Sequence, residues 1–386
     1  MTISNSQSSP YTEYGIPIRN VWHMLLYAWN EAPLNELRGW VLKDAFVEQA
    51  PTLDTLLASV LIRLVQQRLR IGLGHEYVDE AGTLRGLRGR INFGETIRQH
   101  ALERGQLICE FQGYHANSRK NQIIRSTLAR LIKVGRFGPE PAQVMEMQQK
   151  LRRVLRDLDG IDFVELTPDL IRRQLYARGG HDHDYRLMLS ICDLIVQRQM
   201  PADLEGHTTG IVPLIDRELL VLYRVYERFV ANFYRLHLQD WEVSAQKRLE
   251  WHAEEANERL PLMIPDIVLQ ERGSGSIIVL DTKFTAKSLV ENRWGKAVFD
   301  SSHLYQLYAY LKSQEHLSEV HRKAVGILLY PAVHTRFSEK ARLQDQVIRI
   351  ESVDLAAPWQ DVERQLIELI TPDPTCPLGT LPKYDI

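Results

Sequence analysis

Two aspartates and a lysine lie close together in residues 262–283, LMIPDIVLQERGSGSIIVLDTK. Two apolar runs flank a polar segment containing glycine and serine, a pattern typical of two antiparallel strands joined by a turn. With the turn centred at 273–274, Asp266 lies opposite Asp281, because positions equidistant from the centre of a hairpin are cross-strand partners. Lys283 follows Asp281 by two residues and is therefore expected on the same face of the strand.

The facing aspartates predict a site for a divalent cation. Two like charges opposite each other in an apolar sheet are destabilising. Mg²⁺ is bound by one or two carboxylates and keeps its other positions for water and phosphate oxygens. We therefore expect Asp266 and Asp281 to be Mg²⁺ ligands, with Mn²⁺ as a substitute. The alternative for the two aspartates and Lys283 is a surface salt bridge.

Two predicted helices flank this hairpin and must position further side chains. In the helix 303–311, Gln306 and Tyr310 are four residues apart and share a face. In the helix from Asp216 to about His237, Glu218 and Glu227 are candidates for a third carboxylate. Glu227 is preferred because it lies in the middle of the helix among aromatic residues, although a surface glutamate is the alternative for both.

The length of 386 residues predicts two domains. The segment 201–213, which holds proline, glycine and threonine, is the best linker candidate, and the expected domains are 1–205 and 206–386. With 47 basic and 49 acidic residues, the molecule as a whole does not attract nucleic acid, so any such contact requires a local patch.

The sequence carries no sign of export or of a membrane span. The first fifteen residues are polar, without the basic start and apolar core of a signal peptide, and no run of about 18 apolar residues is present. The three cysteines are widely spaced and form no CxxC pair, which favours a reducing compartment. We therefore expect a cytoplasmic protein.

The first half of the chain contains two candidate surfaces for a partner. Arg85, Arg88 and Arg90 alternate with glycines and could present guanidinium groups to phosphates or to acidic groups of a protein. Arg119 and Arg125 belong to a predicted basic helix over 119–133 with no acidic residue. Ordinary solvent-exposed arginines are the alternative in both cases.

The tetrad His181, Asp182, His183 and Asp184 has residue types that bind metals. Four consecutive residues cannot all converge on one ion, and the preceding glycines are typical of a polar loop. The loop interpretation is therefore preferred over a metal site.

The order of these elements resembles the PD-(D/E)xK nuclease superfamily, in particular its RecB-like branch. The motifs are Pro265-Asp266, Asp281-Thr282-Lys283, and Gln306 with Tyr310. Four further stretches carry a wider resemblance: IPIRNVWHMLLYAW (16–29), GLRGRINFGETI (86–97), SRKNQIIRSTLARLIK (118–133) and LYQLYAYL (304–311). Together they resemble the McrC family, the nuclease subunit of the McrBC modification-dependent restriction system, and this resemblance covers nearly the whole chain.

The resemblance implies a fold and a division of labour. The expected fold is α/β (α+β overall), with a carboxy-terminal restriction-endonuclease-like domain whose central mixed sheet is flanked by helices. The amino-terminal α+β domain would dock on and stimulate a ring-shaped hexameric AAA+ GTPase of the McrB type, which recognises 5-methylcytosine-type modification in double-stranded DNA. The chain has no GxxxxGK[ST] motif, so we expect it to bind no nucleotide itself.

The resemblance also implies roles for single residues. Asp266, Asp281 and the carbonyl of Thr282 would hold Mg²⁺, and Lys283 would orient or deprotonate the attacking water. Gln306 and Tyr310 would steady the lysine or a DNA phosphate. Two other functions stay open at this point: a free-standing RecB-like repair nuclease, and a non-catalytic regulator of an AAA+ ring.

Overall fold

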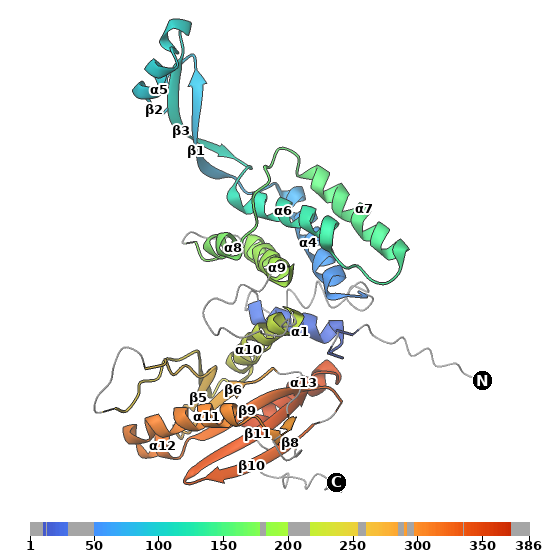
Figure 1. The fold of residues 1–386 in the computed structure, drawn as a ribbon, viewed down its shortest axis with the longest axis vertical. Coiled ribbons are helices and arrows are strands. Elements are labelled where there is room, and N and C mark those ends of the chain that lie inside the picture. Colours follow the sequence, from blue (N-terminus) through green and yellow to red (C-terminus); the bar gives the residue numbers. More distant parts are fainter. Residues whose placement is uncertain are drawn as a thin grey trace, which may run out of the picture. The chain divides into compact units, whose positions relative to one another are not determined.

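The computed structural model describes residues 11–12, 14–29, 50–177, 183–199, 217–253, 260–284, 289–291, 297–334 and 336–371. The chain forms two compact units (Figure 1). The sheet unit comprises Met1–Ala50 and Ala202–Ile386, and the ribbon unit comprises Pro51–Pro201.

The amino-terminal boundary differs from the expected split into 1–205 and 206–386, because residues 1–50 belong to the sheet unit. Helix α1 (Ile18–Trp29) is buried on almost every side, and such a helix needs partners all around it. Helix α10 (Arg217–His237) is one of them: the rings of Tyr27 and Phe233 lie 5.4 Å apart. The amide of Asn20 donates to the carbonyl of Leu355, 2.7 Å away.

A mixed six-stranded sheet forms the centre of the sheet unit. Its strand order is β10-β11-β9-β6-β5-β4; the neighbours β11/β9 and β9/β6 are parallel and the other pairs antiparallel. The strands are β4 (Trp241–Ala245), β5 (Ile267–Glu271), β6 (Ile277–Thr282), β9 (Val325–Ala332), β10 (Ser338–Leu343) and β11 (Gln346–Asp354). Strands β7 (Leu289–Glu291) and β8 (Ala297–Phe299) form a separate small pair.

Helix α11 (Ser301–Gln314) packs on one face of this sheet. Its Leu307 and Leu311 are buried in an apolar cluster with Val279 of β6 and Leu328 of β9. The short η2 (Glu315–Leu317) and α12 (Glu319–Arg322) follow it. Helix α13 (Trp359–Ile370) joins α10 through a hydrogen bond from the hydroxyl of Tyr234 to the carbonyl of Leu366 at 3.0 Å. The predicted α/β class, with a mixed sheet flanked by helices, is confirmed.

In the ribbon unit, a long antiparallel ribbon extends from a group of helices (Figure 1). Strands β1 (Glu76–Leu84) and β3 (Leu107–His115) form the ribbon, and the two-residue β2 (Arg90–Ile91) adds to β3 near its far end. The ribbon carries α5 (Phe93–Arg98) and η1 (Leu102–Arg104). The helices are α4 (Leu53–Ile71), α6 (Arg119–Val134), α7 (Pro141–Asp157), α8 (Pro168–Leu175) and α9 (His183–Gln199).

The tetrad at 181–184 contributes no described metal site. His181 and Asp182 lie outside the described residues, and His183 and Asp184 begin α9. No group of three or more His, Cys, Asp or Glu side chains suited to a metal comes together in the described parts of the chain. The same parts contain no helix that is long and apolar enough to cross a membrane.

Candidate active site

The hairpin of β5 and β6 has the register expected from the sequence. Ile267 pairs with Leu280 and Gln270 with Ile277. Continued by one residue, this register places Asp266, which immediately precedes β5, opposite Asp281. The carboxylate of Asp281 is 2% exposed, so it lies in the apolar sheet as predicted.

Thr282 holds the carboxylate of Asp266 in place. Oδ2 of Asp266 accepts hydrogen bonds from the backbone N–H and from Oγ1 of Thr282, both at 2.7 Å. The N–H and C=O of one residue in an extended strand point to the same side. The carbonyl of Thr282 therefore faces the side of Asp266, where β5 has not yet begun.

Lys283 continues the backbone of β6 and points its ammonium group at Asp281. Its backbone N–H donates to the carbonyl of Leu329 at 2.9 Å. Its Nζ forms an ion pair with Oδ2 of Asp281, and the lysine side chain is 11% exposed. Oδ2 of Asp281 is itself buried and accepts no well-formed hydrogen bond within the described residues. The ammonium group is thus a close but incomplete partner for this oxygen.

Helix α11 completes a hydrogen-bonded chain that begins at Lys283. Nζ of Lys283 donates to Oε1 of Gln306 at 2.8 Å, and Nε2 of Gln306 donates to the hydroxyl of Tyr310 at 2.8 Å. That hydroxyl donates in turn to the carbonyl of Ile264 at 3.2 Å, just ahead of Asp266. The spacing of Gln306 and Tyr310 by one helical turn is what allows both to lie on this chain.

Burial raises the pKa of both aspartates. For Asp281, loss of solvation and the neighbouring Asp266 carboxylate raise the pKa to about 6, although Lys283 opposes the shift. For Asp266, burial also raises the pKa, while the two hydrogen bonds from Thr282 and the charge of Lys283 lower it. A buried carboxylate whose pKa is raised by burial and by a second carboxylate is characteristic of a catalytic or cation-binding site.

Glu227 of α10 lies beside these aspartates, as expected of the third acid. Burial, and then the charge of Asp266, raise its pKa. The side chain of Glu218 is outside the described residues. In the same region sequence reasoning missed Tyr223, one helical turn before Glu227, whose pKa is raised by burial and by the charges of Asp266, Glu227 and Asp281. The spacing of four residues was the available signal.

Gln246 was also missed, although it connects two parts of the site. Its side-chain amide donates to Oε1 of Glu227 at 2.7 Å, and its backbone N–H donates to the carbonyl of Asp266 at 2.8 Å. Gln246 has a φ of 49°, which is uncommon for a residue other than glycine. Only coordinates reveal this conformation, since the sequence around it is that of an ordinary strand end.

The donor set fits a hard divalent cation. Two nearby carboxylates and a backbone carbonyl are oxygen ligands of the kind that Mg²⁺ binds, with water and phosphate filling its other positions. The buried Oδ2 of Asp281, which is paired with the ammonium group of Lys283 but accepts no well-formed hydrogen bond within the described residues, would gain a second charged partner. The candidate ligands are Asp266, Asp281 and the carbonyl of Thr282.

Four of the five arginines considered as partner contacts are exposed. Arg85, Arg88 and Arg90 lie at the end of the ribbon, and Arg119 begins α6. The guanidinium group of Arg88 lies 4.1 Å from the centre of the Phe111 ring. One flat face of this guanidinium group is therefore already covered by the ring.

The prediction that Arg125 is an exposed contact is wrong. Its side chain is 15% exposed and lies 3.6 Å from the carboxylate of Asp159. It also donates to the carbonyl of Ile161 and stacks over Phe163 at 4.4 Å. Arg125 therefore joins α6 to the segment that follows α7. The sequence pattern of a basic helix could not distinguish this inward arginine from the outward ones.

These observations define a two-unit α/β protein with a buried dicarboxylate–lysine site on a mixed sheet. Residues 9–331 match the model of the McrBC 5-methylcytosine restriction system component family. The chain is 30% identical over 361 residues to the type IV methyl-directed restriction enzyme EcoKMcrBC of Escherichia coli (strain K12), covering 92% of this chain and 97% of that relative. The chain therefore belongs to the McrBC component family, on the McrC side that the sequence motifs indicated.

Two solved structures are also similar to this chain. One is a half-complex of Thermococcus gammatolerans McrB AAA+ hexamers with bound McrC, with a TM-score of 0.49 and 15% identity over 92% of this chain and 76% of that one. The other is the McrBC complex of the same organism, with a TM-score of 0.37 and 14% identity over 58% of each chain.

Proposed function

We propose that this chain is the endonuclease subunit of a modification-dependent restriction complex and hydrolyses DNA phosphodiesters with Mg²⁺. The observation that carries the proposal is the connected arrangement of Asp266, Asp281, Lys283, Gln306 and Tyr310, which is that expected of a PD-(D/E)xK nuclease. Membership of the McrBC component family and the name of the E. coli relative, a methyl-directed restriction enzyme, support the same function.

In this mechanism Asp266, Asp281 and the carbonyl of Thr282 would hold the cation. When bound there, Mg²⁺ would supply Lewis acidity that makes water easier to deprotonate and stabilises negative charge on the phosphate in the transition state. Thr282 fixes the orientation of Asp266 through its two hydrogen bonds. Glu227, held by Gln246, adds negative potential at the site from α10.

Lys283 handles the proton of the attacking water. Its ammonium group lies between Asp281 and Gln306, so it occupies a defined position without being locked to one acidic partner. From there its ammonium group orients the water or, after releasing one proton to solvent, the neutral amine accepts a proton from the attacking water. Gln306 and Tyr310 keep the lysine in this position.

The experiment is a cleavage assay on 5-methylcytosine-containing duplex DNA with the full-length chain, its AAA+ partner and GTP. We expect cutting with Mg²⁺ or Mn²⁺, none with EDTA, and 5′-phosphate ends. Asp281→Ala should abolish cutting while stimulation of the GTPase persists. Lys340→Ala, on an exposed part of β10, is the matched control. Cutting by Asp281→Ala at the normal rate would overturn the proposal, and cutting without partner or nucleotide would favour a free-standing nuclease.

We assign partner binding to the end of the ribbon. Leu87, Phe93, Ile97 and Leu102 are between 58% and 68% exposed there. Exposed apolar side chains gathered at one place are typical of a protein interaction site. Together with Arg85, Arg88 and Arg90 they form what we call the ribbon tip. The partner is a McrB-like AAA+ GTPase hexamer, which also reads the modified base in this proposal.

A further inference from the structure

A pocket lies on the same face of the sheet as Asp281. It has a volume of about 340 Å³ and lies between residues 247–251, the end of α11 and strands β5 and β6. Val279 forms part of its floor and precedes Asp281 by two residues on β6, a separation of about 7 Å along a strand. The ring of Tyr310 lines the pocket, while its hydroxyl binds Gln306 of the catalytic chain. The pocket therefore adjoins the proposed cleavage site.

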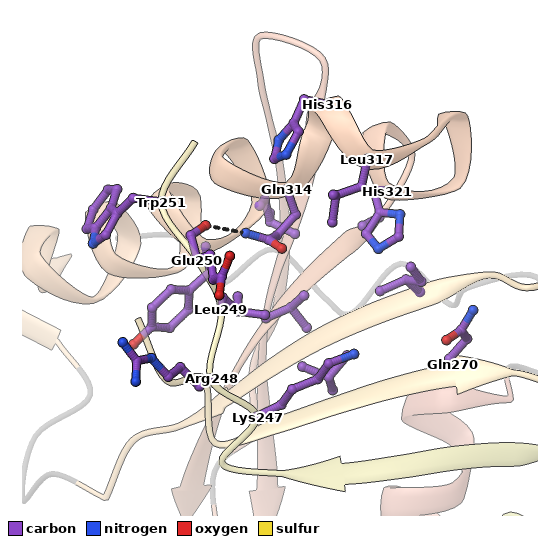
Figure 2. Close-up of a pocket in the computed structure, with 16 residues that line it drawn as sticks. Lys247, Arg248, Leu249, Glu250, Trp251, Gln270, Gln314, His316, Leu317 and His321 are labelled. Atoms are coloured by element: carbon purple, nitrogen blue, oxygen red, sulfur yellow. Dashed lines mark hydrogen bonds between the residues drawn. The ribbon is translucent and has the colours of Figure 1, made fainter. Parts of the chain in front are cut away.

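The lining combines an apolar floor with a basic rim. The floor is formed by Val268, Ile277, Val279 and Leu311. Figure 2 shows Lys247 and Arg248 on one side, with His316 and His321 on the other. Glu250 is the one carboxylate among the lining residues, and neither Lys247 nor Arg248 has an ion pair with an acidic side chain in the described parts of the chain. Among the described residues, Lys247 and Arg248 therefore give the rim its positive charge, while burial and the charge of Lys247 lower the pKa of His321.

The walls of the pocket are already fixed. The amide of Gln314 donates to the carbonyl of Glu250 at 2.9 Å, which ties residues 247–251 to α11 (Figure 2). The indole N–H of Trp251 donates to the carbonyl of Pro261 at 2.7 Å, so its ring has a set orientation while remaining 39% exposed. A preformed site loses little conformational entropy on binding.

We propose that this pocket binds one nucleotide of the DNA strand that is cut, beside the scissile phosphodiester. Lys247 and Arg248 contact its phosphate, and its unstacked base enters the apolar floor next to Trp251. Cations that follow the backbone, combined with an aromatic and apolar surface for a base, are the recognised way to hold single-stranded nucleic acid. The inference rests on the proposed nuclease function. Because the pocket floor at Val279 is only two residues from Asp281 along β6, the bound nucleotide is one or two positions from the cut.

The first test measures DNA binding without cleavage. The full-length chain with its partner is titrated with methylated duplex in EDTA over a range of salt concentrations. Lys247→Ala with Arg248→Ala should raise Kd at least about tenfold. The salt dependence of log K should fall by roughly 1.5, since each lost phosphate contact removes about 0.7 to 0.9. The matched control is Lys340→Ala with Arg342→Ala, two exposed residues of β10 at the opposite edge of the sheet.

The second test locates the nucleotide. 5-Iodouracil is placed at successive positions of the duplex, the complex is irradiated, and cross-linked peptides are identified by mass spectrometry. We expect cross-links to Trp251 only from positions one or two nucleotides from the cut. Cross-links confined to other peptides would overturn the assignment, as would a double variant that binds like its control. The assignment would also be overturned if free GMP, but not DNA, protected the Trp251 indole from chemical modification.

Failure of the proposed nuclease function can be distinguished from failure of the proposed nucleotide pocket. Absence of cutting by the wild-type complex would overturn the proposed function itself. Normal cutting by the wild type, combined with unchanged Kd and KM in Lys247→Ala with Arg248→Ala, would overturn this inference alone. Unchanged GTPase stimulation by the double variant shows that it is folded.

Discussion

The dicarboxylate–lysine site of the sheet unit and the ribbon tip of the ribbon unit expose and bury side chains in opposite ways. In the sheet unit, Asp281 is 2% and Lys283 11% exposed, so charges have been removed from water. At the ribbon tip, Phe93 and Ile97 are each 65% exposed, so apolar groups face water. Both arrangements are unfavourable for the isolated chain. In the proposed function each would be relieved by a ligand of the matching kind, a cation at the dicarboxylate site and a protein surface at the ribbon tip.

Lys283→Ala is expected to separate the functions of the two regions most clearly, because it should affect DNA cleavage and leave partner binding unchanged. The variant removes the group that positions or deprotonates the water, and such groups contribute about 10² to 10⁴ in rate. We expect cleavage of methylated DNA to fall by about 100- to 10,000-fold, while partner binding and GTPase stimulation stay normal. Lys340→Ala should be indistinguishable from wild type. A Lys283→Ala variant that cuts within tenfold of wild type would contradict the assignment of catalysis to the buried site of the sheet unit.

The converse variant is Phe93→Ser combined with Ile97→Ser. Removing two exposed apolar side chains from an interface should weaken binding of the AAA+ partner by about 30- to 800-fold, since well-placed apolar contacts are worth about 1–2 kcal/mol each. GTPase stimulation should fall in parallel, with the thermal stability of the isolated chain unchanged. Tyr176→Ser, at another 68% exposed position of the ribbon unit, is the control. Normal affinity of the double variant, measured by isothermal titration calorimetry, would exclude the ribbon tip as the docking surface.

A third prediction concerns the energetic cost of the buried charges. The pKa of Asp281 is about 6 in the folded chain, against an ordinary value of 3.8. The folded state therefore holds the proton more tightly, and stability falls as pH rises from about 4 to about 6, up to roughly 3 kcal/mol. The side chain of the Asp281→Asn variant cannot ionise, so its stability should not fall over this pH range.

Thermal unfolding in EDTA measures the effect. Asp281→Asn should unfold at a higher temperature than wild type at pH 7.5, and the difference should largely vanish at pH 4. Mg²⁺ should stabilise the wild type and not the variant. Equal melting temperatures at pH 7.5 would show that the buried carboxylate is not destabilising.

The sequence was sufficient to predict the centre of the site. The register that brings Asp266 opposite Asp281 depends only on a short hairpin, and the pairing of Gln306 with Tyr310 depends on one helical turn. Both are local regularities, which alternation and helical spacing encode directly.

What the sequence did not reveal depends on contacts between distant segments. The place of α1 in the sheet unit rests on contacts such as that between Asn20 and Leu355, 335 residues apart. The role of Gln246 rests on a left-handed backbone that no residue type signalled. The pocket at Trp251 likewise requires a loop, a helix end and a sheet face to meet. The residue pattern of a single helix or strand carries no information about which distant segments it will contact.

The smallest effect is expected on the free energy of unfolding, when two arginines of α6 in the ribbon unit are replaced in turn. Arg125 donates a hydrogen bond to Ile161, lies near Asp159 and covers Phe163, whereas Arg119 is exposed and contacts Gln122 at 3.0 Å.

Replacing the buried guanidinium leaves the carbonyl of Ile161 without its partner. Arg125→Ala should therefore lower the free energy of unfolding by about 1–3 kcal/mol. Arg119→Ala should change it by no more than about 0.5 kcal/mol. Chemical denaturation monitored by fluorescence measures both.

Neither substitution touches the ribbon tip, so Arg125→Ala should bind the AAA+ partner with normal affinity at temperatures where it is folded. Loss of partner binding by folded Arg125→Ala would mean that the docking surface extends from the ribbon tip onto α6. Loss in Arg119→Ala alone would place the exposed basic face of that helix in the interface. Normal binding by both confines docking to the ribbon, where exposed apolar side chains lie together with Arg85, Arg88 and Arg90.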